Sequence, residues 1–151
     1  MRISVGNDHR GLGVKQELIR LLSRLGHDVA DDGHNSDEAC DYPDIAAAVA
    51  GKVAGGKADR GILVCGTGIG MAIAANKTPG IRAATVDDEV SAEISRRHND
   101  LNILCLSADL IGKKNIDRIV EVWLTTEFDG GRHERRLNKI RDLEKAACAA
   151  G

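Results

Sequence analysis

The sequence predicts an α/β fold in which a parallel, five-stranded sheet is covered by helices on both faces. Short aliphatic runs alternate along the chain with segments whose apolar residues recur every three or four positions. Strands that alternate with helices pair in parallel, and their right-handed crossovers place helices on the sheet. The length of 151 residues suits one compact domain, residues 1–151, and leaves little room for a second.

The strands are predicted from short apolar runs. The clearest is Gly61–Cys65, an uninterrupted run that is typical of a buried strand. The segment 31–43 is polar and is expected to form a loop. The other strands are expected at Arg2–Gly6, His27–Ala30, Arg82–Val86 and Asn102–Leu106.

The helices are predicted from their apolar spacing and their end signals. Val14, Leu18, Leu22 and Leu25 are spaced as one apolar helix face, and Gly26 stands where a C-cap glycine belongs. Further helices are expected at about 43–54, 71–76, 87–97, 116–124 and 132–147.

Composition excludes several classes of protein. The net charge is −2, from 21 basic and 23 acidic side chains without a long block of one sign, so no nucleic-acid partner is expected. No apolar run approaches the ~20 residues of a membrane span, and the first residues turn polar too soon for a signal peptide. Without a C-x-x-C pair, the cysteines are expected to be free thiols of a cytoplasmic protein; they are Cys40, Cys65, Cys105 and Cys148.

Ligands of such sheets bind at the carboxyl ends of the strands, near a topological switch point. The strongest feature there is Cys65–Gly70, Cys-Gly-Thr-Gly-Ile-Gly, which follows the clearest strand. Its alternate glycines leave backbone N–H groups unobstructed, and such groups converge on an anion at a strand-to-helix turn. A tight turn would need only one glycine for positive φ, so the sequence favours a ligand-binding turn.

A nucleotide-binding module without catalytic activity is the alternative from another class. Counting from Gly66, the sixth position of a G-x-G-x-x-G fingerprint is Met71, so that pattern fails. Asp87 nevertheless lies roughly where a ribose-binding acid would stand.

Cys65, Asp8 and His9 are candidate site residues because each follows a predicted strand. A thiolate at Cys65 could act as a base, although buried cysteines are often inert. Asp8 could equally be the N-cap of the next helix.

Two further groups of side chains are candidates at helix ends. His98 closes the fourth predicted helix, where either a functional or merely exposed histidine would fit. Arg132 and Arg136 share one helix face and could form a phosphate clamp or a solvated charged surface. The five histidines show no ligand-like spacing with one another or with the cysteines, so no metal site is predicted.

Taken together, the motifs resemble those of ribose-5-phosphate isomerase type B, in the wider group that includes galactose-6-phosphate and allose-6-phosphate isomerases. Each piece is weak alone, but the ordered set is specific and covers nearly the whole chain. The matching pieces are Gly6–His9, Asp41–Pro43, Cys65–Gly70, Ala74–Lys77, Gly80–Arg82, Arg97–Asp100 and Gly130–His133.

The resemblance implies a Rossmann-like, three-layer α/β/α sandwich that isomerises a small-molecule sugar phosphate through an enediolate. It implies a homodimer or tetramer with the active site at the subunit interface, and no metal or organic cofactor. Ribose 5-phosphate and ribulose 5-phosphate are the expected pair. A six-carbon sugar phosphate, galactose 6-phosphate or allose 6-phosphate, remains an alternative substrate. A non-catalytic partner subunit remains an alternative role for the chain.

The resemblance also implies residue roles. Cys65 resembles the catalytic base and Thr67 the hydroxyl that helps move a proton between substrate oxygens. His98, with Asp8 nearby, resembles the residue that opens the sugar ring. The amides of Gly66, Gly68 and Gly70 resemble an enediolate-binding nest. His9, Arg132 and Arg136 resemble the phosphate ligands. Tyr42 and Asn99 resemble residues that contact substrate hydroxyls.

Two positions distinguish this sequence within the family it resembles. Met71 stands where a branch without the cysteine uses a glutamate, which is coherent with the cysteine branch. Asp109 stands where many relatives carry an arginine thought to help bind phosphate, and a carboxylate there would repel a phosphate. Lys113 or Lys114 is a candidate to compensate for that repulsion.

Overall fold

The sheet is built from five parallel strands in the order β2-β1-β3-β5-β4. The computed structural model describes residues 1–149, and the side chains of all of these except Lys113 and Lys114. Each predicted strand is confirmed, with both ends within one residue of the expected position. The strands are β1 (Arg2–Asn7), β2 (Asp28–Asp31), β3 (Arg60–Cys65), β4 (Ala83–Thr85) and β5 (Ile103–Ser107).

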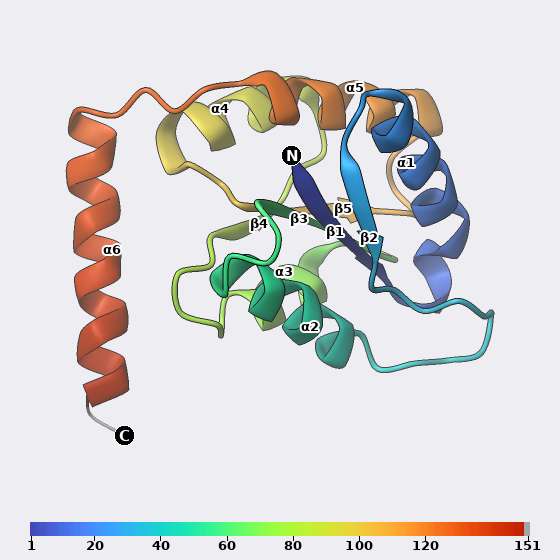
Figure 1. The fold of residues 1–151 in the computed structure, drawn as a ribbon, viewed down its shortest axis with the longest axis horizontal. Coiled ribbons are helices and arrows are strands. Elements are labelled where there is room, and N and C mark those ends of the chain that lie inside the picture. The colour runs from blue at the N-terminus through green and yellow to red at the C-terminus, as the bar shows by residue number, and fades with distance from the viewer. Residues whose placement is uncertain (150–151) are drawn as a thin grey trace.

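Helices cover both faces of the sheet, which confirms the three-layer arrangement (Figure 1). One face carries α1 (Leu12–Arg24), α4 (Glu89–Asn99) and α5 (Lys113–Thr125). The other carries α2 (Tyr42–Ala54) and α3 (Ile69–Ala75). Among the helices of residues 1–149, none combines the length and the apolar character that crossing a membrane requires.

Each face of the sheet has its own apolar core. Successive strand side chains point to opposite faces, so Ile62 and Val64 pack toward α1 and α5. Leu63 and Cys65 pack toward α2 and α3. The alternation along β3 therefore places the Cys65 thiol under α2 and α3, at the carboxyl end of the strand.

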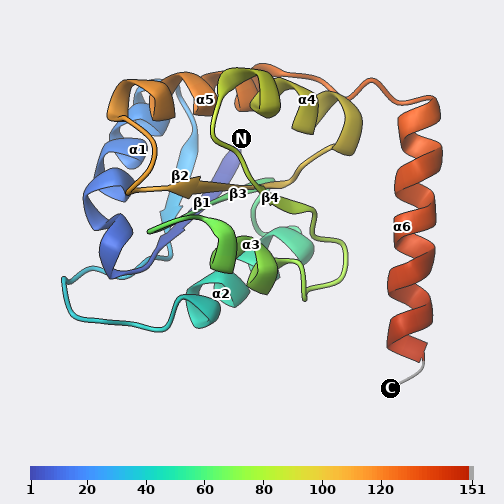
Figure 2. The ribbon, with the colours of Figure 1, turned by 180° about the vertical axis from the view of Figure 1, so that it is seen from behind.

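The last helix, α6 (Arg132–Ala149), stands apart from the sandwich in both views (Figures 1 and 2). Its buried side chains lie in its first turns, at His133 and Leu137. Farther along, Ile140 is 44% exposed and Leu143 is 71% exposed. The apolar side of α6 is thus left largely uncovered by its own chain.

The strand order creates a switch point between β1 and β3. From β1 the chain crosses to β2 on one side, and β3 pairs with β1 on the other. The backbone N–H of Asp8 donates to the carbonyl of Val64 over 3.1 Å, which continues this pairing beyond the end of β1. The residues that follow these two strands therefore lie side by side, where open α/β sheets bind ligands.

A buried lysine fixes the loop between β2 and α2. Lys15 on α1 is fully buried, and its ammonium group is an ion-pair partner of Asp31 at 2.9 Å. Nζ also donates to the carbonyl of His34 at 2.9 Å and to Oδ1 of Asn35 at 2.6 Å. A buried ammonium is tolerated only when its donors are used in this way. Lys15 thus holds the loop that leads to Tyr42.

We predict that Lys15→Met lowers the free energy of unfolding by about 3 kcal/mol, because it keeps the alkyl stem but leaves the acceptors of Asp31 and Asn35 without their donor. Urea denaturation followed through the single tryptophan, Trp123, measures the loss. Lys57→Met, at an exposed position, is the control and should change stability by less than about 0.5 kcal/mol. Equal losses in the two variants would contradict the anchoring role of Lys15.

Candidate active site

The turn between β3 and α3 brings a backbone amide onto the Cys65 sulfur. Gly68 has a φ of +77°, a left-handed conformation that strains residues with a side chain. This conformation lets the N–H of Gly68 donate to Sγ of Cys65 over 3.1 Å. Cys65 is 5% exposed. The thiol therefore has a hydrogen-bond donor that stabilises negative charge on sulfur.

The other two glycines in the turn lie close to side chains of distant segments. A Cβ on Gly66 would lie 2.9 Å from a carboxylate oxygen of Asp109 and 3.0 Å from Nε of Arg10. A Cβ on Gly70 would lie 2.7 Å from the ring of Tyr42. A side chain at position 66 or 70 would therefore displace these neighbours.

The residues after β1 form a capped turn beside Cys65. Asp8 is buried, and its Oδ1 accepts from the N–H groups of Arg10 at 2.9 Å and Gly11 at 3.2 Å. The sequence left two interpretations of Asp8 open, a site residue and an N-cap. These two hydrogen bonds are those of an N-cap. His9 begins the short 3₁₀ helix η1 (His9–Gly11) and is half-buried.

Tyr42 and Thr67 complete a cluster at the carboxyl edge of the sheet. Tyr42 is the first residue of α2, is 40% exposed and lies against Gly70. Thr67 is exposed, and its hydroxyl accepts from the N–H of Ile69 over 3.3 Å. We call Asp8, His9, Tyr42, Cys65 and Thr67 the carboxyl-edge group.

The remaining candidates lie at the opposite edge of the sheet. Helix α4 runs back from the carboxyl end of β4, so its last residues return to the amino ends of the strands. Arg82, just before β4, donates to the carbonyl of Asn99 over 3.0 Å and ties the end of α4 to that edge. We call His98, Asn99, Arg132 and Arg136 the amino-edge group. Within one chain, therefore, the amino-edge group and Cys65 lie at opposite edges of the sheet.

A pair of stacked histidines lies within the amino-edge region. The rings of His98 and His133 are 4.1 Å apart between centroids and 7° from parallel. Burial, the neighbouring His98, and the cations Arg132 and Arg136 lower the pKa of His133. The spacing analysis missed this contact because the two histidines are far apart in sequence.

Asp129 joins this pair, and ligand atoms of His98, Asp129 and His133 lie within 4.8 Å of one another. Imidazole nitrogens bind metals in the plane of the ring, and two nearly parallel stacked rings do not aim their lone pairs at one point. Asp129 also accepts from Nε of Arg97 at 3.2 Å, and this bond lowers the pKa of Asp129. The geometry fits a stacked pair with a neighbouring ion pair better than a metal centre.

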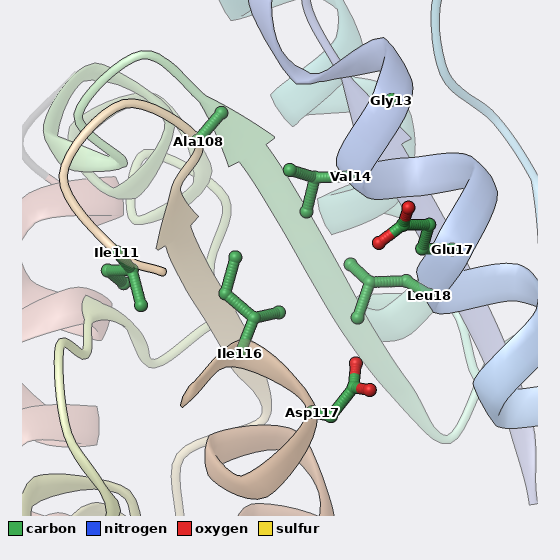
Figure 3. Close-up of a pocket in the computed structure, with 8 residues that line it drawn as sticks. All are labelled: Gly13, Val14, Glu17, Leu18, Ala108, Ile111, Ile116 and Asp117. Carbon is green, nitrogen blue, oxygen red and sulfur yellow. The ribbon is translucent and has the colours of Figure 1, made fainter. Parts of the chain in front are cut away.

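A separate cavity of about 270 Å³ lies between α1 and α5 (Figure 3). Its wall includes Val14, Leu18 and Ile116, together with the carboxylates of Glu17 and Asp117. The apolar residues belong to the core on the face away from Cys65. An apolar wall with carboxylates does not suit an anionic ligand, so we place the candidate site at the carboxyl edge instead.

Asp109 has a partner that sequence reasoning missed. Nη2 of Arg10 lies 2.6 Å from Oδ2 of Asp109, and Nε donates to the same oxygen over 2.9 Å. The sequence analysis had considered Lys113 or Lys114, whose side chains lie outside the described part of the structure. The signal in the sequence was the position of Arg10 directly after Asp8 and His9.

Fold and site define an α/β protein with a buried thiol at the switch point of a parallel sheet. A family model described as Ribose/Galactose Isomerase matches residues 3–140. The chain belongs to this family.

Individual relatives agree with the family match. The chain is 44% identical to "Ribose-5-phosphate isomerase B" of Escherichia coli over 144 residues, which are 95% of this chain and 97% of that protein. Ribose-5-phosphate isomerase B of Clostridium thermocellum superposes with a TM-score of 0.96 at 46% identity, covering 97% of this chain and 99% of that one. Ribose-5-phosphate isomerase B of Mycoplasma genitalium, solved with bound ribulose-5-phosphate, superposes with a TM-score of 0.92 at 42% identity. The match covers 95% of this chain and 96% of that one. The resemblance and the Rossmann-like fold predicted from the motifs are confirmed.

We predict that Gly70→Ala displaces the ring of Tyr42, because the new Cβ would lie 2.7 Å from ring carbons. Tyr42 is the only tyrosine, so its ring resonances in an NMR spectrum report the displacement without assignment of the whole chain. Gly13→Ala is the control, since a Cβ there meets nothing within 4 Å. Unchanged Tyr42 resonances in Gly70→Ala would show that the ring is not packed on this turn.

Proposed function

We propose that this protein interconverts ribose 5-phosphate and ribulose 5-phosphate, with Cys65 as the base. The observation that carries the proposal is the buried Cys65 sulfur with the Gly68 N–H directed onto it at 3.1 Å, beside the end of β1. The name of the Escherichia coli relative and the ligand in the Mycoplasma genitalium structure favour the five-carbon pair over a six-carbon sugar phosphate.

The proposed reaction moves one proton from C2 to C1 of the open-chain sugar. The Cys65 thiolate takes the C2 proton, and negative charge develops on the oxygen at C1. The amides of 66–70 stabilise that charge where it forms, as oxyanion donors do. Thr67 carries a proton from the oxygen on C2 to the oxygen on C1, and Cys65 returns its proton to C1. The aldose becomes the ketose with all atoms conserved.

Ring opening precedes this transfer. We assign His98 to protonate the ring oxygen and Asp8 to accept the proton of the anomeric hydroxyl. Because Oδ1 of Asp8 caps the η1 turn, we assign this proton to Oδ2. The phosphate is assigned to His9, Arg132 and Arg136, and the substrate hydroxyls to Tyr42 and Asn99.

This assignment requires two copies of the chain. His98 and Cys65 lie at opposite edges of one sheet, so a second copy must bring its amino-edge group to the carboxyl-edge group of the first. Uncovered apolar side chains support such an association: on α3 Ile69 is 55% and Ile73 59% exposed, and α6 exposes Ile140 and Leu143. A symmetric homodimer, alone or paired into a tetramer, would contain two equivalent sites.

We further propose that residues 1–151 form one catalytic domain that works in the cytoplasm without a cofactor. Each step above uses a side chain or a backbone amide of this chain. A cytoplasmic setting fits the cysteines, all of which are free thiols in residues 1–149.

We predict that Cys65→Ala lowers kcat for ribose 5-phosphate by roughly a thousandfold or more, because it removes the base. Inorganic phosphate should still bind, as calorimetry can measure, since the phosphate ligands are untouched. Cys105→Ala, in the same apolar core, is the control and should keep its turnover. Near-normal turnover of Cys65→Ala would disprove the base assignment.

We predict that two inactive variants complement each other when their chains are mixed. Cys65→Ala and His98→Asn, unfolded together and refolded, should regain about a quarter of wild-type activity, because about half of the dimers are mixed and each holds one intact site. Cys65→Ala mixed with Thr67→Ala is the control and should stay inactive, since both defects lie at the carboxyl edge. Absence of recovery in the first mixture would contradict a shared site.

A further inference from the structure

The Arg10–Asp109 ion pair lies on the candidate site itself. A side chain at position 66 would displace it, since a Cβ there would lie 2.9 Å from Asp109 and 3.0 Å from Arg10. Both ends are held by the backbone near the site. The N–H of Arg10 donates to Asp8 over 2.9 Å, and the N–H of Asp109 donates to the carbonyl of Gly66 over 3.2 Å.

Stability does not explain this pair. The side chain of Arg10 is 55% exposed and that of Asp109 38%, and pairs this exposed contribute little to folding. The pair Arg2–Asp59, at the amino ends of β1 and β3, has the same 2.6 Å distance and similar exposure, 51% and 39%. It therefore serves as an internal reference for what such a pair contributes to stability alone.

The guanidinium of Arg10 retains donors for a ligand. Nε and Nη2 both donate to Oδ2 of Asp109, whereas Nη1 makes no hydrogen bond to the part of the chain that the structure describes. A guanidinium carries more N–H donors than this pair uses, and its planar fork matches a phosphate. Asp109 fixes the orientation of the guanidinium without using up its donors.

The burial of the site sets the direction in which a substrate would lie. The reacting carbons must reach Cys65, which is 5% exposed, so the other end of the substrate points outward to the rim. The rim beside Cys65 carries His9 and the half-exposed Arg10. The substrate end that reaches Arg10 is therefore the phosphate.

We infer that Arg10 binds the phosphate group of the sugar phosphate next to His9, and that Asp109 is a positioning residue that holds the Arg10 guanidinium over Gly66. This inference rests on the proposed function. It assigns the carboxylate at position 109 a role in orienting a cation, in place of the repulsion expected from its charge.

The test compares Arg10→Met with Arg2→Met, which removes the reference pair at the other edge. For Arg10→Met we expect KM for ribose 5-phosphate and the dissociation constant of inorganic phosphate to rise about ten- to a hundredfold. We expect kcat to stay within about threefold. Arg2→Met should change none of these constants, and both variants should melt alike.

Three further variants separate the binding and positioning roles from misfolding. Arg10→Lys keeps the cation and should retain phosphate binding within about tenfold. Asp109→Asn should raise KM for ribose 5-phosphate and the dissociation constant of inorganic phosphate by about three- to tenfold, with kcat preserved. Asp109→Glu keeps the carboxylate and should leave both constants close to those of the wild type.

Phosphate binding measured by calorimetry distinguishes this inference from the proposed function, because it does not depend on turnover. A wild-type protein without isomerase activity would overturn the proposed function, while weakened phosphate binding in Arg10→Met would still support the role of Arg10. Phosphate binding in Arg10→Met equal to that in Arg2→Met would overturn the inference. So would a large fall in kcat with unchanged phosphate binding, which would place Arg10 at the enediolate.

Discussion

The pairing of β1 with β3 is the contact on which the candidate site depends. In this register Asn7 lies opposite Val64, and the Asp8 N–H bonds to the Val64 carbonyl at 3.1 Å. A shift by one residue would turn the Cys65 side chain to the other face of the sheet. The register therefore decides that Cys65 and the residues after β1 share one edge and one face.

Glycines in these two strands let α2 approach the sheet. A Cβ on Gly6 would lie 2.8 Å from Ile45, and one on Gly61 would lie 2.7 Å from Val49. Both neighbours belong to α2, whose first residue is Tyr42. The close packing of this helix brings the Tyr42 ring onto the glycine turn. Gly6 and Gly61 in the strands therefore help to position the side chain of Tyr42.

Ion pairs fix a turn at each of the two edges of the sheet. At the carboxyl edge, Lys15 anchors the loop before α2. At the amino edge, Asp100 adopts a positive φ of 45°, which is strained for a residue with a side chain. Its carboxylate pairs with Arg82 and with Arg96, each at 2.8 Å. These bonds offset the strain and fix the end of α4, where His98 lies. Each half of the proposed shared site is thus tied to a turn stabilised by ion pairs.

The sequence allowed the elements to be predicted well and their assembly less well. Buried strands appear as aliphatic runs, so their ends were predicted to within one residue, and the turn at 65–70 was evident from its glycines. The strand order was not predicted, because pairing between distant strands leaves no local pattern. Arg10 escaped notice for the same reason, since its partner lies 99 positions away.

The site shows the same division between local and long-range information. Composition and spacing gave His98 no connection to Cys65, and only the resemblance put them in one reaction. The folded chain explains the difficulty, because it places the two residues at opposite edges of the sheet, and under the proposed function a second chain brings them together. No pattern within one sequence specifies a contact between two copies.

Helix α6 connects assembly to catalysis. Helices in proteins gain most of their stability from tertiary packing, and α6 buries little beyond His133 and Leu137 against its own chain. In the proposed homodimer, a second copy would cover its apolar side, which carries Ile140 and Leu143. Arg132 and Arg136 stand in the first turns of this same helix. In the proposed homodimer, the association that stabilises α6 would therefore also complete the active site.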